Sequence, residues 1–174
     1  MKKIIESRLI AVICLVLCVA AACTLGVRRS AKALEDDLLE AFRSSPEQYV
    51  TAKTAMQDVS IAAHNFLDAY ESLHGDGDSA VLSDLLDRFD KHKDSPFGST
   101  SPNDILNAAK HLYDSLRGED TAKGDAKYYY NQLKSLTQQL ARNEAYNDAA
   151  KAYNQKAASF PVSLFTAGEA RVFD

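Results

Sequence analysis

The chain has 174 residues, of which 46% are apolar and 25% are charged, a balance typical of a folded protein rather than a disordered one. It has no tryptophan, only seven glycines and four prolines, and a formal net charge of −4 at pH 7. This composition favours long helices over short strands, and the length suits one domain.

The first feature along the chain is an uncharged apolar segment, Leu9–Val27. Its nineteen residues would form a helix rising about 28 Å, close to the thickness of the hydrocarbon core of a bilayer. Basic residues flank it on both sides, at Lys2, Lys3, Arg8, Arg28, Arg29 and Lys32. We therefore expect residues 9–27 to cross the lipid bilayer after a short flank, residues 1–8, which makes a single-pass protein of the cell membrane.

Two alternatives to an uncleaved membrane helix stay open. Residues 20–22 are three alanines that resemble a signal-peptidase site, and Cys23 could carry a lipid in a lipoprotein. The uninterrupted length and the basic residues on the far side favour the membrane helix. Because each flank carries three basic residues, the positive-inside rule does not choose an orientation, and the side of the soluble domain stays open.

The remaining domain, expected over residues 34–174, is acidic and contains no cysteine. All three cysteines lie in the apolar segment, at Cys14, Cys18 and Cys23. Beyond residue 32 the chain carries 14 basic and 23 acidic residues, a formal charge of −9, which repels nucleic acid and anionic lipid headgroups. We expect no nucleic-acid partner, disulfide framework or cysteine-based zinc site.

Three helices are predicted next, each by apolar residues at steps of three and four. Ser45, Pro46 and Gln48 have the order of a helix start. The seam of the helix that follows is Tyr49, Ala52, Met56, Val59, Ala63, Phe66, Tyr70 and Leu73. A second helix, residues 79–92, has the stripe Leu82, Leu85, Leu86 and Phe89. A third, opened by Ser101, Pro102 and Asp104 in capping-box order, has Ile105, Ala109, Leu112 and Leu116.

The last predicted helix covers residues 126–160 without a break and would be about 52 Å long. Its seam is Tyr129, Leu133, Leu136, Leu140, Asn143, Asn147, Ala150, Asn154 and Ala157. A second apolar stripe, Tyr146, Ala150, Tyr153, Ala157 and Phe160, opens beside it. The four helices together predict an all-α fold, an antiparallel bundle of long helices behind the membrane helix.

Residues 145–154, AYNDAAKAYN, write Ala-Tyr-Asn twice at heptad spacing. We expect the tyrosines to pack into a neighbouring helix pair. We expect Asn147 and Asn154, at the edge of the seam, to fix helix register, as buried amides do in coiled coils.

The C-terminal stretch, residues 145–173, resembles the C-terminal signature of the LemA family. In that family a long helix with paired Tyr-Asn motifs ends at an aromatic-Pro step and a Leu-containing tail that closes on an aromatic. The matching positions are Tyr146, Asn147, Tyr153, Asn154, Phe160, Pro161, Leu164 and Phe173. The resemblance implies a membrane-anchored helical bundle, mostly bacterial, and a divergent member, because the family's usual arginine run is missing from the first bundle helix.

Candidate chemical sites are few. His64, Asp68 and Glu71 share one helix face at metal-ligand spacing, and His111 and Asp114 could add ligands from another helix. Exposed polar residues opposite an apolar seam explain the same spacing more simply. The chain has no nucleophile-elbow or Rossmann glycine pattern, so we expect no catalytic residue, no metal and no cofactor.

These observations favour a non-enzymatic interaction or scaffold protein that binds an unknown protein partner at the bacterial membrane. The alternative is a secreted or lipid-anchored helical bundle that binds a small ligand between its helices.

Overall fold

The computed structural model describes residues 2–44, 50–74, 78–116 and 123–173, with side chains from residue 10 onward. Within these ranges the fold is all-α, as predicted, and the only strand-like pairing is an isolated antiparallel bridge between Phe97 and Ala170. The helices are α1 (Lys2–Arg43), α2 (Ala52–His74), α3 (Ala80–Asp90), α4 (Pro102–Ser115), α5 (Gly124–Ala141), α6 (Glu144–Ala157) and the short 3-10 helix η1 (Val162–Leu164).

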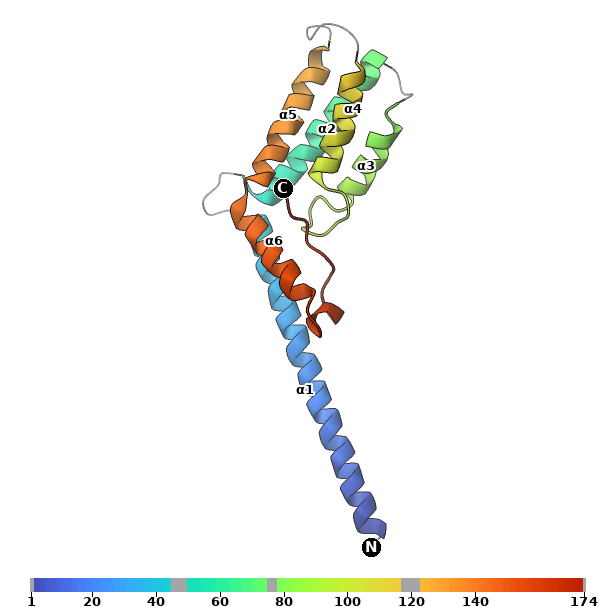
Figure 1. Ribbon diagram of the computed structural model, residues 1–174, viewed down its shortest axis with the longest axis vertical. Helices are drawn as coiled ribbons and strands as arrows, with labels where there is room; N and C mark the ends of the chain where they lie inside the picture. The colour runs from blue at the N-terminus through green and yellow to red at the C-terminus, as the bar shows by residue number, and fades with distance from the viewer. Residues whose placement is uncertain (1, 45–49, 75–77, 117–122, 174) are drawn as a thin grey trace.

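Helices α2, α3, α4 and α5 form a four-helix bundle in which neighbours in the chain alternate in direction (Figure 1). The predicted seams are part of its core: α2 buries Ala52, Met56, Val59, Ala63, Phe66 and Tyr70, and α4 buries Ile105, Ala109 and Leu112, followed by the buried C-cap residue Leu116. Leu73, predicted in the seam of α2, is exposed near the end of that helix. Ser45, Pro46, Gln48 and Tyr49 lie outside the described residues.

Helix α4 begins as its sequence predicts. The Ser101 hydroxyl accepts a hydrogen bond from the Asp104 backbone N–H at 3.1 Å, and the Asp104 carboxylate accepts from the Ser101 backbone N–H at 2.8 Å. Pro102 occupies the first helical position, where its missing N–H has no intrahelical partner to lose. The capping box therefore defines where the third predicted helix starts.

Helix α1 is one continuous helix from Lys2 to Arg43, so no break separates the apolar segment from the folded domain. It is long and apolar enough to cross a membrane by length and composition, with a mean hydropathy of 2.8 in its most apolar 18 residues. Its second half was not assigned from the sequence, yet Ala31, Leu38 and Phe42 are buried there. In Figure 1 the first half projects from the molecule and the second lies along α6.

The predicted single helix over residues 126–160 is wrong, because the chain breaks between α5 and α6. Asn143 is the N-cap of α6, and its side-chain oxygen accepts from the Tyr146 backbone N–H at 3.2 Å. The Asn143 backbone N–H bonds to the Leu140 carbonyl at 3.0 Å, a tight turn that ends α5. Asparagine favours such caps because its short amide competes with the helical backbone. The break lets α5 pack in the bundle and α6 pack on α1.

Candidate functional site

The residues of the Tyr-Asn repeat meet the C-terminal end of the chain. After α6 the chain passes through a turn, residues 158–166, here called the end turn, which contains η1. The C-terminal tail, residues 167–173, then runs back beside α6 toward the loop between α3 and α4, residues 91–101 (Figure 1). The tail thus lies between α6, which packs on α1, and the bundle of α2 to α5.

Asn147 holds the end of the tail. Its side-chain oxygen accepts from the Phe173 backbone N–H at 2.8 Å, and its side-chain nitrogen donates to the carbonyls of Leu140 and Ala141, both at 3.2 Å. One buried amide therefore satisfies the carbonyl end of α5 and a backbone N–H of the tail. This pattern replaces the expected role in helix register.

Asn154, one heptad later, pairs with the backbone of Ala170 in both directions. Its side-chain nitrogen donates to the Ala170 carbonyl at 2.8 Å, and its oxygen accepts from the Ala170 N–H at 2.7 Å. An asparagine amide carries the same donor and acceptor as a peptide group, so the two residues pair as two strand residues would. The repeat thus presents two peptide-like amides, two turns apart, to an extended tail.

Tyr146 places an aromatic ring between α1 and the tail. Its ring centroid lies 5.6 Å from that of Phe42 on α1 and 4.9 Å from that of Phe173. Its hydroxyl donates to the Arg171 carbonyl at 2.7 Å. Burial raises the pKa of Tyr146 well above its usual value, against a smaller opposing effect of the Arg171 charge. The neutral phenol is therefore the hydrogen-bond donor throughout the physiological pH range.

Arg171 fastens the tail to the loop between α3 and α4. Its guanidinium donates to four backbone carbonyls, those of His92, Ser95, Phe97 and Thr100, at 2.5, 2.6, 3.1 and 3.1 Å respectively. Burial lowers the pKa of Arg171 to about 10, so the guanidinium stays charged at neutral pH. A charged group that donates to carbonyls forms stronger hydrogen bonds than a neutral one.

The loop is shaped to receive this guanidinium. A Cβ at Gly98 would lie 3.0 Å from Cζ of Arg171 and 3.0 Å from Cβ of His92, tighter than most real Cβ contacts, so these neighbours would have to shift. The Arg171 guanidinium also lies 5.8 Å from the ring centroid of Phe89 on α3. A glycine at position 98 therefore permits the close approach of tail and loop.

Tyr153 is buried, as predicted, but its ring packs against the loop between α3 and α4 rather than into a pair of helices. Its ring centroid lies 5.5 Å from that of Phe97, and the side chain is 2% exposed. Its hydroxyl lies beside Thr166 and the Ala167 backbone, yet forms no hydrogen bond of normal geometry. Burial raises the pKa of Tyr153, and the charge of Glu35 raises it further. The two tyrosines of the repeat thus differ in how their hydroxyls are satisfied.

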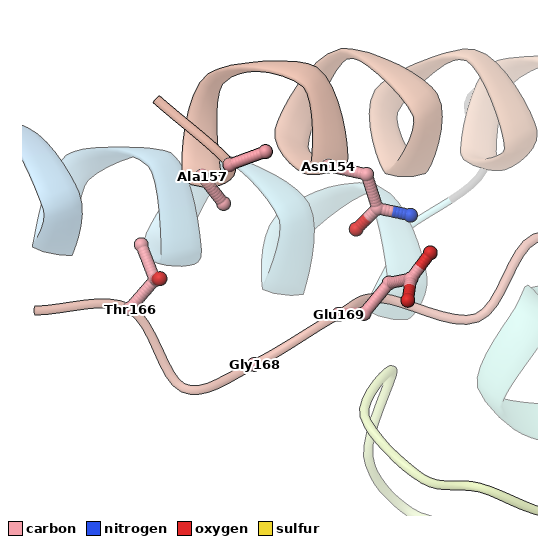
Figure 2. A pocket seen from close by; sticks show the side chains of 6 residues that line it. Asn154, Ala157, Thr166, Gly168 and Glu169 are labelled. Atoms are coloured by element: carbon pink, nitrogen blue, oxygen red, sulfur yellow. The ribbon is translucent and has the colours of Figure 1, made fainter. Parts of the chain in front are cut away.

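A small hollow lies between α6 and the tail (Figure 2). It has a volume of about 310 Å³ and is lined by Asn154, Ala157, Ala158, Thr166, Gly168 and Glu169. The Asn154 amide already binds Ala170, so Thr166 and Glu169 supply its remaining polar side chains. Nothing in this lining groups the donors or acceptors that a specific polar ligand requires.

The last motif residues do not all join the core. Phe160 was expected in the stripe with Tyr146 and Tyr153, but its side chain is 81% exposed, and Leu164 is 67% exposed. Pro161 is half-buried, and Phe173 is buried against Tyr146. The expectation fails for Phe160 because α6 ends at Ala157, so the three-four periodicity no longer applies.

A second polar group lies on the surface of the bundle. Asp90 accepts hydrogen bonds from Ser60 at 2.5 Å and from His64 at 2.8 Å, and Lys93 lies 3.3 Å from the same carboxylate. Burial would raise the pKa of Asp90, but the bonds to His64, Ser60 and Lys93 outweigh it and lower the pKa. Ser60 and His64 each bind the Asp90 carboxylate rather than each other. A serine nucleophile is activated by a direct hydrogen bond to an imidazole, so this arrangement differs from that of a serine nucleophile and its base.

The side chains considered as metal ligands on α2 do not converge on one point. His64 binds Asp90, and Glu71 accepts a hydrogen bond from Ser79 at 2.5 Å, while Asp68 is exposed. Across the ranges that the structure describes, no three His, Cys, Asp or Glu side chains come together as metal ligands.

The sequence patterns missed Arg171 and gave Asn143 a seam position rather than its role as a helix cap. Asn143 follows Leu140 at the seam, and an asparagine there is a cap signal as well as a seam position. Leu38 and Phe42 were also missed, although their spacing of four after an apolar helix indicates a continuing helix face. Arg171 has no such local signal, since its partners lie 71 to 79 residues earlier in the chain.

The fold and the site define an all-α protein with a candidate membrane helix at its N-terminus and a C-terminal tail held by the Tyr-Asn repeat. Comparison of the chain with family models, curated proteins and solved structures gives no match in any of the three.

Proposed function

We propose that the chain is a single-pass membrane protein of the LemA type, a non-enzymatic interaction or scaffold protein at the bacterial membrane. The observation that carries this proposal is the continuity of α1. The apolar half leads without a break into Leu38 and Phe42, which are buried in the core. A helix that both crosses a bilayer and joins the core would hold the domain at a defined height above the membrane.

The contacts of the tail support the family assignment. Five of the eight positions that match the LemA signature, Tyr146, Asn147, Tyr153, Asn154 and Phe173, lie together where α6 receives the tail. Tyr146 and Asn147 contact Phe173, and Asn154 binds the tail at Ala170. Signature residues that serve one contact between α6 and the tail have a structural reason to occur as a unit. The assignment predicts that the corresponding asparagines in LemA proteins bind their own tails, and a LemA structure with these amides in solvent would contradict it.

The membrane assignment has a direct test in the mature protein. Intact mass measurement of protein isolated from its native membrane should give the full chain, with residues 1–27 present. A chain that begins near Cys23 would instead support the secreted or lipid-anchored alternative.

The interaction proposal is tested by photo-crosslinking in the native cell. A photoreactive residue at Ile61, Val81 or Tyr128, all exposed on the bundle, should give a discrete adduct with a protein partner from at least one position. The same residue at Leu17, in the apolar segment, is the matched control and should react with lipid. Adducts at Leu17 but at none of the bundle positions would contradict a scaffold function.

A further inference from the structure

The end turn exposes large apolar side chains at one place on the surface. Phe160 and Leu164 are 81% and 67% exposed, and they lie within five residues of each other. The remaining exposed apolar residues of the folded domain are distributed singly over α2, α3 and α5, as is normal for a soluble surface. The two exposed apolar side chains of the end turn therefore raise the question of which surface covers them.

The end turn lies beside the point where the apolar segment of α1 stops. Phe165 and α1 line a hollow of about 400 Å³, to which α1 contributes Leu25, Arg28, Arg29, Lys32, Glu35 and Asp36. The Ala167 backbone N–H, directly after the turn, donates to the Glu35 carboxylate at 2.7 Å. These two contacts fix the height of the end turn along α1.

That height corresponds to the headgroup layer if α1 crosses a bilayer. The uncharged run ends at Val27. At about 1.5 Å per residue, Arg28 lies within roughly 2 Å of that boundary and Lys32 about 7 Å beyond it. The polar layer on each side of the hydrocarbon core is about 5 to 8 Å thick. Phe165 shares its hollow with α1 residues from Leu25, inside the uncharged run, to Asp36, about 14 Å beyond Val27, and thus lies beside the headgroup layer.

The charges beside the end turn suit this position. Arg28, Arg29 and Lys32 are exposed and would face the lipid phosphates, whereas Glu35 lies about 12 Å beyond Val27, outside the headgroup layer. The domain as a whole is acidic and is repelled by anionic lipid, so its contact with the membrane must be local. Aromatic and aliphatic side chains next to basic residues are the composition of interfacial anchors.

We propose that the end turn is a second membrane contact, in which Phe160 and Leu164 insert into the interface of the bilayer that α1 crosses and Arg28, Arg29 and Lys32 bind lipid phosphates. This proposal rests on the proposed membrane span of α1. Two contacts on one face, the helix and the turn, prevent the domain from rotating or tilting freely about a single helix. The bundle would then present a fixed face to its partner.

The absence of tryptophan from the chain allows a clean test. Full-length Phe160→Trp and Leu164→Trp, each with one indole, are reconstituted into phosphatidylcholine vesicles whose acyl chains are either native or brominated. Bromine quenches an indole that contacts the acyl chains. We expect a blue-shifted emission for both variants and the loss of most of it in the brominated bilayer. Val81→Trp, exposed on α3, is the matched control and should lose none.

Leu17→Trp, in the apolar segment, separates this proposal from the one on which it rests. Quenching of Leu17→Trp without quenching of Phe160→Trp and Leu164→Trp would leave the membrane span intact and overturn the second contact. No quenching of Leu17→Trp would overturn the span itself. A blue shift of Phe160→Trp that bromine does not quench would mean that protein covers the turn, and would also overturn the proposal.

A further experiment tests whether the basic residues bind lipid phosphates. Adding phosphatidylglycerol to the brominated bilayer should deepen the quenching of Phe160→Trp, because anionic headgroups attract the three basic side chains. The same variant with Arg28, Arg29 and Lys32 all changed to Gln should lose this dependence on anionic lipid. Equal dependence in the two backgrounds would overturn phosphate binding by these residues.

Discussion

The two halves of the folded domain share one apolar core but differ in their polar contacts. Buried apolar residues form a single cluster from the bundle of α2 to α5 into α1 and α6, whereas the tail adds directional hydrogen bonds between its backbone and the side chains of Asn147 and Asn154. An apolar core tolerates changes of similar volume, but a buried amide or guanidinium requires its particular partners. The stability of the bundle should therefore depend on side-chain volume. The attachment of the tail should depend on which hydrogen-bonding groups are present.

Truncation of one buried aromatic ring in each half tests whether the two halves are equally well packed, and it should cause the largest loss of stability. Tyr146→Ala, between α1 and the tail, and Phe66→Ala, in the bundle, each remove a fully buried ring. Each should lower the free energy of unfolding by about 3 to 5 kcal/mol. Chemical denaturation of the full-length protein in detergent measures both. A loss far smaller at Tyr146 than at Phe66 would mean that α6 is only loosely docked.

The next prediction concerns the hydrogen bonds of a buried amide. Asn147→Leu keeps the branched shape and the number of heavy atoms of the side chain but leaves the Phe173 N–H and two carbonyls without their partner. It should cost about 2 to 3 kcal/mol, since buried polar groups lose their hydrogen bonds. Asn131→Leu, on the exposed face of α5, is the control and should leave the denaturation midpoint unchanged. A stabilised Asn147→Leu protein would restore the original interpretation of the amide as a register residue.

Asp90 accepts several hydrogen bonds on the bundle surface, and its lowered pKa predicts that stability depends on pH. Because its folded-state pKa is lowered, its contribution to stability is present above the ordinary aspartate pKa and is lost as the pH falls through the lowered value. Asp90→Asn should cost on the order of 1 kcal/mol at pH 7 and progressively less below pH 3.8. Melting curves of both proteins between pH 7 and pH 2 should converge at the acid end; a constant difference would contradict this account.

The smallest effects compare the two tyrosines of the repeat. Tyr146→Phe loses the bond to the Arg171 carbonyl and should cost about 1 kcal/mol. Tyr153→Phe removes a buried hydroxyl that has no hydrogen bond of normal geometry, and its stability should be unchanged or slightly higher. Thermal melts of the pair decide this. An equal loss in both variants would show that Tyr153 also depends on its hydroxyl.

The periodic parts of the chain could be predicted from sequence because helix packing repeats every three or four residues. The seam of α2 and the capping box of α4 are local patterns and are present as predicted. The sequence does not separate α5 from α6 at Asn143, because the three-four periodicity continues through Asn143 and Asn147, and an asparagine at this place fits a seam position as well as a cap. Apolar periodicity does not distinguish one helix from two that continue the same stripe.

The tail could not have been placed from sequence. The tail contributes backbone groups to its hydrogen bonds with Asn147 and Asn154, and because every residue carries such groups, neither composition nor spacing marks the residues of the tail that are bound. The Tyr-Asn repeat was recognisable as a signature, but the same letters suit a coiled-coil seam and a tail-binding surface. The structure distinguishes these by the extended backbone opposite the amides.

The repeated asparagines hold the C-terminal tail through its backbone, and amide hydrogen exchange measures this contact residue by residue. In the full-length protein the N–H groups of Ala170 and Phe173 should exchange slowly, as groups bonded to buried side chains do. Asn147→Leu should release Phe173 while amides in the middle of α5 keep their protection. Rapid exchange of Ala170 and Phe173 in the unmodified protein would contradict the account.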